Sequence, residues 1–247
     1  TKAANILLEK DLAPIKIFYP DNEGTRYYRR SEDYPERHKN IGIEFGRQWH
    51  WDAIFHEYVH FIADIEDLAD PPGGRHAVGI SNITGGTALL NGISREISSR
   101  GKDEGTRLAW SEGLAHYFAL ALQKTAKDHG FLPEISTLGN STSVDAIHTN
   151  NAKYSVIHNL EHNTGSGFST VSQNSGEGDE ASVMRILWDL ADEKNEVHDD
   201  IALGHSELYK ILEFISDIGA FDGLEQLNDI WKYFASLTNS DPSQRVR

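Results

Sequence analysis

The chain has no cysteine among its 247 residues and a single methionine, Met184. Without cysteine there is no disulfide and no thiolate metal site, so a bound metal would need His, Asp or Glu ligands. No apolar run approaches the length of a membrane span. Lys and Arg are few, 23 against 38 acidic residues, which gives a net charge of −15. Nucleic acid is therefore not expected as a partner, because phosphate binding needs clustered basic residues.

The remaining composition is that of an ordinary globular protein, with 38% hydrophobic and 25% charged residues. We find no internal repeat and no interdomain linker, so residues 1–247 are predicted to form one domain. The chain opens with TKAANILLEK, without an initiator methionine or a basic-apolar signal segment. We expect a mature form or a domain excised from a longer protein.

Hydrophobic periodicity predicts an α+β fold with a small N-terminal β-containing part and a mainly helical C-terminal part. Short strands are expected at 15–19 and 41–45, with a loop or hairpin excursion at 21–40 between them. Helices are expected from about residue 50 to 67 and at 87–99, 106–127, 179–192, 205–218 and 223–237. The Gly- and Ser-rich segment 163–178 is predicted to be a surface loop rather than a gate over a cleft.

The first of these helices contains His56-Glu57-Tyr58-Val59-His60, an HExxH pattern. Residues four apart lie on one helix face, so His56 and His60 can bind one zinc ion. Glu57 then lies beside the metal, where it can take a proton from a zinc-bound water. This pattern predicts a hydrolytic zinc site with two of its ligands and its general base.

A third ligand is needed, because catalytic zinc sites usually have three protein ligands and one water. Metzincins would have Gly and His at the third and sixth positions after His60, where this chain has Ala63 and Glu66. Glu112 is the better candidate, 52 residues after His60 in the apolar run LAWSEGLAHYFALAL. A carboxylate buried there without a partner would be costly, which favours metal ligation.

HEYVH followed by WSEGLAHYFA resembles the gluzincin zinc metallopeptidases of the peptidase MA-like type. The segment GDEASVMRILWDLAD is similar to a helix that follows the active site in related bacterial exported proteins. The resemblance covers about residues 15–192 and implies a zincin-like fold. It also implies Zn²⁺ ligation by His56, His60 and Glu112, with Glu57 as general base. The implied activity is that of a metalloendopeptidase on peptide or protein substrates, in a secreted or cell-surface location.

The sequence departs from the family at two positions. Val59 stands where many of these enzymes have Gly, and His116 stands where some have an Asp that orients the first His ligand. Asp52 and Asp64 share the helix face of the motif and are alternative partners for the ligands. Surface positions for these two acids are equally compatible with the sequence.

A peptidase also needs a donor for the oxyanion of the transition state, which gluzincins often take from a Tyr or His after the third ligand. Four residues lie in that part of the chain: His148, Tyr154, His158 and His162. We favour Tyr154, because a phenol donates without needing a particular protonation state.

Other features leave alternatives open. The acidic group Asp64, Glu66, Asp67 and Asp70 suits calcium in composition, but its spacing favours a solvated helix end. Residues 41–45 are expected to form an edge strand near the cleft, where a peptide can pair. The sequence also leaves two other functions open: a catalytically silent zincin-like binding domain and a hydrolase of non-peptide amides. The intact Glu57 argues against the silent domain.

Overall fold

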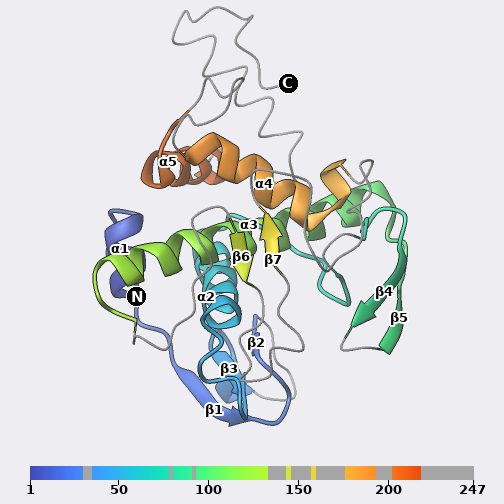
Figure 1. The fold of residues 1–247 in the computed structure, drawn as a ribbon, viewed down its shortest axis with the longest axis horizontal. Helices are drawn as coiled ribbons and strands as arrows, with labels where there is room; N and C mark the ends of the chain where they lie inside the picture. Colours follow the sequence, from blue (N-terminus) through green and yellow to red (C-terminus); the bar gives the residue numbers. More distant parts are fainter. Residues whose placement is uncertain are drawn as a thin grey trace, which may run out of the picture.

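The computed structural model describes residues 1–29, 35–77, 80–90, 93–132, 143–145, 157–159, 176–192 and 202–217. Figure 1 shows a small sheet of N-terminal strands on one side of the long helix α3 and the helices α4 and α5 on the other side. The α+β prediction, with a small N-terminal mixed sheet and a mainly helical C-terminal part, is confirmed.

The N-terminal sheet consists of β1 (Ile17–Asp21), β2 (Arg26–Tyr27) and β3 (Ile41–Glu44). Both predicted strands are present, the first displaced by two residues. The strand order is β1-β3-β2, with β1 parallel and β2 antiparallel to β3. The expectation that 41–45 is an edge strand is therefore wrong. Strand β3 pairs with a neighbour on each side and is mostly buried, and β1 and β2 are the edges of this sheet.

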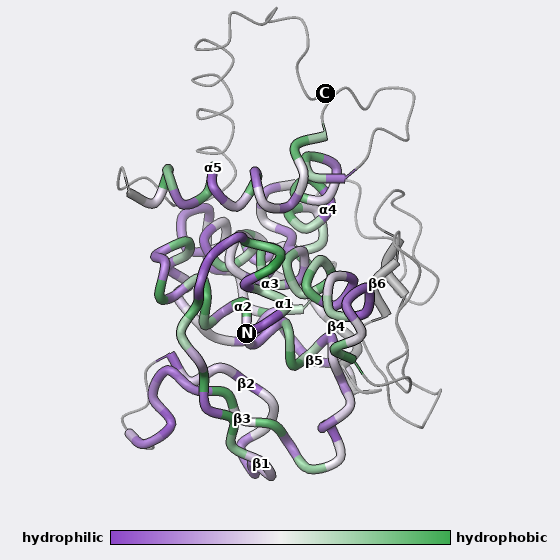
Figure 2. Tube along the Cα trace, turned by 90° about the vertical axis from the view of Figure 1, so that its left-hand side faces the viewer, coloured by the Kyte–Doolittle hydropathy of each residue, from purple (hydrophilic) through white to green (hydrophobic). Residues whose placement is uncertain are grey.

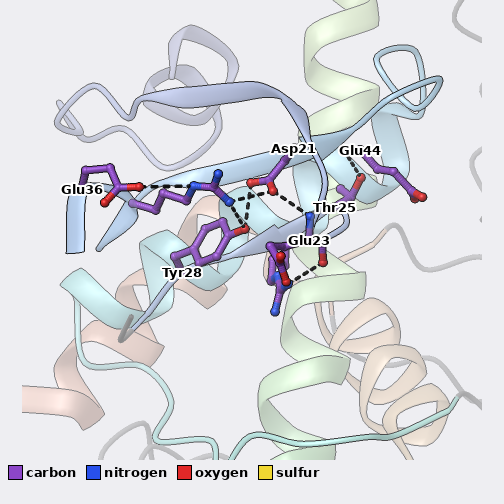
Figure 3. Close-up of polar contacts among 8 residues, drawn as sticks. Asp21, Glu23, Thr25, Tyr28, Glu36 and Glu44 are labelled. Atoms are coloured by element: carbon purple, nitrogen blue, oxygen red, sulfur yellow. Dashed lines mark hydrogen bonds and ion pairs between the residues drawn. The ribbon is translucent and has the colours of Figure 1, made fainter. Parts of the chain in front are cut away.

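A polar network fixes the strands around Asp21, whose side chain is 1% exposed (Figure 3). Its carboxylate accepts hydrogen bonds from Tyr28 Oη at 2.7 Å and from the Glu23 N–H at 2.9 Å. It also forms an ion pair at 2.8 Å with Arg37 of the short helix η1 (Pro35–Arg37). The network holds the residue after β2 against the end of β1, and so fixes the path of the edge strand.

Helices α2 (Trp51–Ile65) and α3 (Gly101–Asp128) form the centre of the molecule, with α1 (Lys2–Leu7) also packed on α3. Helix α2 buries one apolar face. Helix α3 is buried on nearly all sides from Gly105 to Ala126, as the sequence predicted for 106–127. In Figure 2 the hydrophobic (green) parts of the trace gather around these two helices. A side chain on either helix that faces the other is therefore shielded from water.

The predicted helix at 87–99 is wrong. These residues form an antiparallel hairpin of β4 (Gly86–Leu90) and β5 (Ile93–Ile97), in which Leu90 pairs with Ile93. Asn91-Gly92, between the strands, is a sequence signal for two-residue hairpins that should have outweighed the apolar spacing. Strands β6 (Ser143–Asp145) and β7 (Ile157–Asn159) form a second antiparallel pair.

After η3 (Gly176–Gly178), helix α4 (Glu180–Ala191) packs on α3, and α5 (His205–Asp217) contacts α4. Both helices were predicted. Asp179 caps α4, because its side chain accepts from the Ala181 N–H. The expected helix at 223–237 and residues 163–175 of the expected loop lie outside the described residues. Among the described helices, none is long and apolar enough to cross a membrane.

Candidate metal centre

Helix α2 brings His56 and His60 together. Ile54, Tyr58 and Phe61 anchor one face of this helix in the core, which turns the two histidines toward α3. The Nε2 atoms of the histidines lie 3.0 Å apart, and the rings meet edge to face. The spacing of four residues has therefore placed two imidazole nitrogens at one point, as the HExxH pattern predicted.

Helix α3 places Glu112 against the same point. Its Oε2 lies 3.1 Å from His56 Nε2 and 3.2 Å from His60 Nε2. Zinc bonds of about 2.0–2.2 Å give ligand atoms about 3.3 Å apart in a tetrahedral site, so this triangle has the right size for one ion. His56, His60 and Glu112 thus form a buried group that can hold a metal ion.

The electrostatics of this group suit a cation. Burial lowers the pKa of His56 to about 4, so its imidazole is neutral and keeps a lone pair. Burial alone would lower the pKa of His60, but the adjacent Glu112 has the larger effect and raises this pKa. Burial alone would raise the pKa of Glu112, but the charges of His60 and His76 hold it well below its usual range. Glu112 is therefore an ionised carboxylate in the interior, where a divalent cation would stabilise it.

Glu57 is positioned by strand β2. The backbone N–H of Tyr27 donates to Glu57 Oε2 at 2.7 Å. Burial raises the pKa of Glu57 to about 7, while the neighbouring His60 acts in the opposite direction. One carboxylate oxygen of Glu57 is thus held by a backbone donor, next to His60.

Asp64 supports this strand rather than a histidine ligand. Its carboxylate accepts from Tyr27 Oη and from Arg29 Nε, each at 2.8 Å, and forms an ion pair with Lys39 at 3.4 Å. Burial acts to raise its pKa, but Tyr27 and Arg29 lower it overall. Asp64 therefore acts on Glu57 indirectly, because it fixes the ring of the residue whose N–H binds the base.

Asp52, the other expected partner of the ligands, and His116 are arranged differently as well. Asp52 accepts a hydrogen bond from Gln123. The ring of His116 packs against the ring of His56, with 4.4 Å between the centroids. His56 Nδ1 is buried and has no hydrogen-bond partner among the described residues. Asp52, Asp64 and His116 therefore do not bind His56 through that nitrogen, and His116 contacts His56 by ring packing.

Three members of the acidic group at the end of α2 form ion pairs. Arg29 joins Asp64 to Asp70, and Arg107 also pairs with Asp70 at 3.0 Å. Glu66 pairs with Lys10. Asp64, Glu66 and Asp70 therefore each face a basic side chain, and Asp64 is nearly buried rather than solvated.

Two residues that the sequence analysis missed approach the centre. His76, in the connector after α2, places Nδ1 2.8 Å from Glu180 Oε2 and Nε2 3.5 Å from Glu112 Oε2. Burial lowers the pKa of His76, but Glu180 and Glu112 outweigh it and raise the pKa to about 10. Glu180 is 1% exposed and begins α4. His76 and Glu180 are 104 residues apart, so only tertiary packing brings them together.

Gly113 explains how Glu180 comes so close to Glu112. A β-carbon at position 113 would lie 2.4 Å from Val183 Cβ and 2.7 Å from the carbonyl oxygen of Glu180. Only glycine lets the first turn of α4 lie against α3 at this point. The Glu112-Gly113 pair thus supplies both a candidate ligand and the space for its neighbour.

The four expected oxyanion donors remain predictions. His148, Tyr154 and His162 lie outside the described residues, and of His158, in β7, only the backbone is described.

Comparisons of the chain with protein families, curated proteins and solved structures found no match. The functional argument therefore depends on the residues and their geometry.

Proposed function

We propose that this protein is a zinc-dependent peptidase of the gluzincin type that hydrolyses internal bonds of peptide or protein substrates. The observation that carries the proposal is the convergence of His56, His60 and Glu112 on one point, with Glu57 beside them. Neither helix alone could form this centre, because two ligands come from α2 and the third from α3.

Zinc suits the donor set. Two imidazole nitrogens and one carboxylate oxygen are common zinc ligands, and three protein ligands leave a fourth position open, as in catalytic sites. Zinc bound there would supply a Lewis acid for the carbonyl group and a water acidified toward neutrality. The absence of sulfur ligands agrees with this choice over thiolate sites.

Glu57 supplies the proton transfer. While the Tyr27 N–H holds Oε2, the carboxylate of Glu57 would accept the proton of the attacking water and return it to the leaving amine. Holding one oxygen reduces the freedom of the carboxylate and so restricts its orientation. A binding module would have no use for such a base, so this arrangement favours an enzyme over a silent domain.

The test pairs zinc content with cleavage of a proteome-derived peptide mixture, analysed by mass spectrometry. The wild type should bind zinc and cleave within peptides. Glu57→Gln should retain zinc and lose at least about 100-fold in rate, the usual contribution of a general base. Glu104→Gln, an exposed acid whose partner Arg100 lies 3.8 Å away, is the matched control.

Three results would contradict this function. Full cleavage by Glu57→Gln would exclude the proposed base. Cleavage of small non-peptide amides without peptide cleavage would support a different hydrolase. Zinc binding with neither activity would favour a binding domain.

A further inference from the structure

The pair formed by His76 and Glu180 lies beside the candidate metal ligands but is not needed to hold the ion. Its members come from the connector after α2 and from the first turn of α4. Glu180 is almost fully buried, and its side chain is bonded to the imidazole at 2.8 Å. A buried carboxylate bonded to one ring nitrogen fixes the orientation of the whole ring.

The ring nitrogens of His76 face two different carboxylates. Nδ1 faces Glu180, and Nε2, on the other side of the ring, faces Glu112. His76, Glu112 and Glu180 are close enough to be considered as a second metal group. However, Nδ1 of His76 is already bonded directly to Glu180 at 2.8 Å, and Oε2 of Glu112 is the same oxygen that meets His56 and His60. The geometry is that of a hydrogen-bonded relay rather than a second metal site.

The proton arrangement follows from the same contacts. A lone pair on either nitrogen would face the lone pairs of a carboxylate, whereas an N–H is attracted to it. The contact of Nδ1 is a normal hydrogen bond, but the 3.5 Å between Nε2 and Glu112 Oε2 exceeds the usual range of about 2.7–3.2 Å. The N–H at Nε2 is therefore directed toward the metal centre without being fully engaged.

His76 is also the member of the cluster that a substrate would meet first. Its side chain is 30% exposed, compared with 13% for His56 and 9% for Glu112. His76 faces Glu112 Oε2, the same oxygen that lies next to His56 and His60. A donor at this place can reach an oxygen atom bound at the metal from the solvent side.

We propose that His76 donates a hydrogen bond from Nε2 to a substrate oxygen held at the metal, with Glu180 as the residue that positions its ring. This role rests on the proposed function, because it requires a metal at His56, His60 and Glu112. It assigns the oxyanion donor to a residue before the third ligand in the sequence, whereas the four expected candidates all follow it.

The test uses the protein loaded with Co²⁺, whose visible absorption reports on oxygen ligands that bind at the metal. Inorganic phosphate is the probe, since it places oxygens around a tetrahedral centre as the reaction intermediate does. Two affinities are measured for each variant: that of the protein for Co²⁺ and that of the cobalt form for phosphate. His129→Ala is the control, because His129 is exposed and its ring contacts the backbone oxygen of Thr125 and the ring of Phe131, away from the candidate ligands.

His76→Ala should bind Co²⁺ as tightly as the wild type but bind phosphate about 10- to 100-fold more weakly, the effect of losing a hydrogen bond to a charged group. Glu180→Gln should weaken phosphate binding less, because its amide oxygen still accepts from Nδ1. His76→Gln should recover part of the loss, since its amide can donate.

Three outcomes would overturn the role. A parallel loss of Co²⁺ affinity in His76→Ala would make His76 a metal ligand. Unchanged affinities for both Co²⁺ and phosphate would make it structural, and a wild type that binds Co²⁺ but no phosphate at the metal would remove the donor role. Failure of the wild type to bind Co²⁺ at all would instead contradict the metal centre itself.

Discussion

The backbone N–H of Tyr27 lies 2.7 Å from Oε2 of Glu57, so an edge strand and the helix with two candidate ligands share one hydrogen bond. The phenol of Tyr27 in turn donates to Asp64, one turn after His60 on α2. Strand β2 is thus attached to α2 at two points, Glu57 and Asp64. The position of the proposed base depends on a strand with only two residues.

Tyr27→Phe tests this attachment. The variant loses the 2.8 Å hydrogen bond to Asp64, which keeps its ion pair with Arg29. The free energy of unfolding should fall by about 1–2 kcal/mol, and turnover should fall with zinc affinity unchanged. Chemical denaturation, zinc titration and peptide cleavage measure the three quantities. Tyr19→Phe is the control, because Tyr19 is 45% exposed. Equal losses in both variants would contradict the special role of Tyr27.

Gly113→Ala tests the contact between α3 and α4. The added methyl group would overlap Val183 and the Glu180 carbonyl oxygen. The free energy of unfolding should therefore fall by about 1–3 kcal/mol. Displacement of Glu180 should also release His76 and weaken phosphate binding to the cobalt form. The double variant with Val183→Ala should recover part of the stability. A Gly113→Ala protein as stable as the wild type would show that α4 lies farther from α3.

Asp21 gives a pH prediction. Burial acts to raise its pKa, but the Glu23 N–H, Tyr28 and Arg37 lower it overall. Because the folded-state pKa lies below the unfolded value, Asp21 stabilises the protein above pH 4 and loses this contribution as the pH falls through the folded-state value. Asp21→Asn should lower the free energy of unfolding by about 2 kcal/mol at neutral pH, the effect of weakening hydrogen bonds to a charged group, and should reduce the loss of stability below pH 4. If urea unfolding between pH 2 and 6 shows the same pH dependence of stability in Asp21→Asn and the wild type, this assignment is contradicted.

Metal removal should lower stability because zinc binds the folded centre. Free zinc at 100 times its dissociation constant stabilises a protein by about 2.7 kcal/mol. A chelator should therefore lower the midpoint of thermal unfolding, and added zinc should restore it. Glu112→Gln should show a much smaller response, since it has lost one ligand. Identical responses in the two proteins would place the stabilising ion elsewhere.

The parts of the site that follow from local spacing could be predicted. His56 and His60 meet because α2 is a helix, and Glu112 was found because a carboxylate in an apolar helix needs a partner. His76 and Glu180 could not be found in this way, because α4 brings them together only through packing at Gly113. The role of Asp64 was missed for a similar reason, since its partners belong to β2 and the residues near it.

The errors in the fold have local causes as well. Apolar spacing at 87–99 fitted a helix, but the Asn91-Gly92 signal and the β-branched Ile93 and Ile97 fitted the observed hairpin better. Residues 41–45 alternate as an edge strand would, yet pairing on both sides puts β3 in the middle. Strand order depends on contacts between distant segments, which alternation alone does not specify.

The most direct test of the central claim is the zinc content and zinc affinity of the wild type compared with Glu112→Gln. The account predicts one zinc ion per wild-type chain, measured by mass spectrometry of the metal and by competition with a chelator of known affinity. Glu112→Gln should remain folded by circular dichroism and lose most of that affinity. A wild type without bound zinc, or a Glu112→Gln variant that binds it equally well, would contradict a metal centre formed by His56, His60 and Glu112.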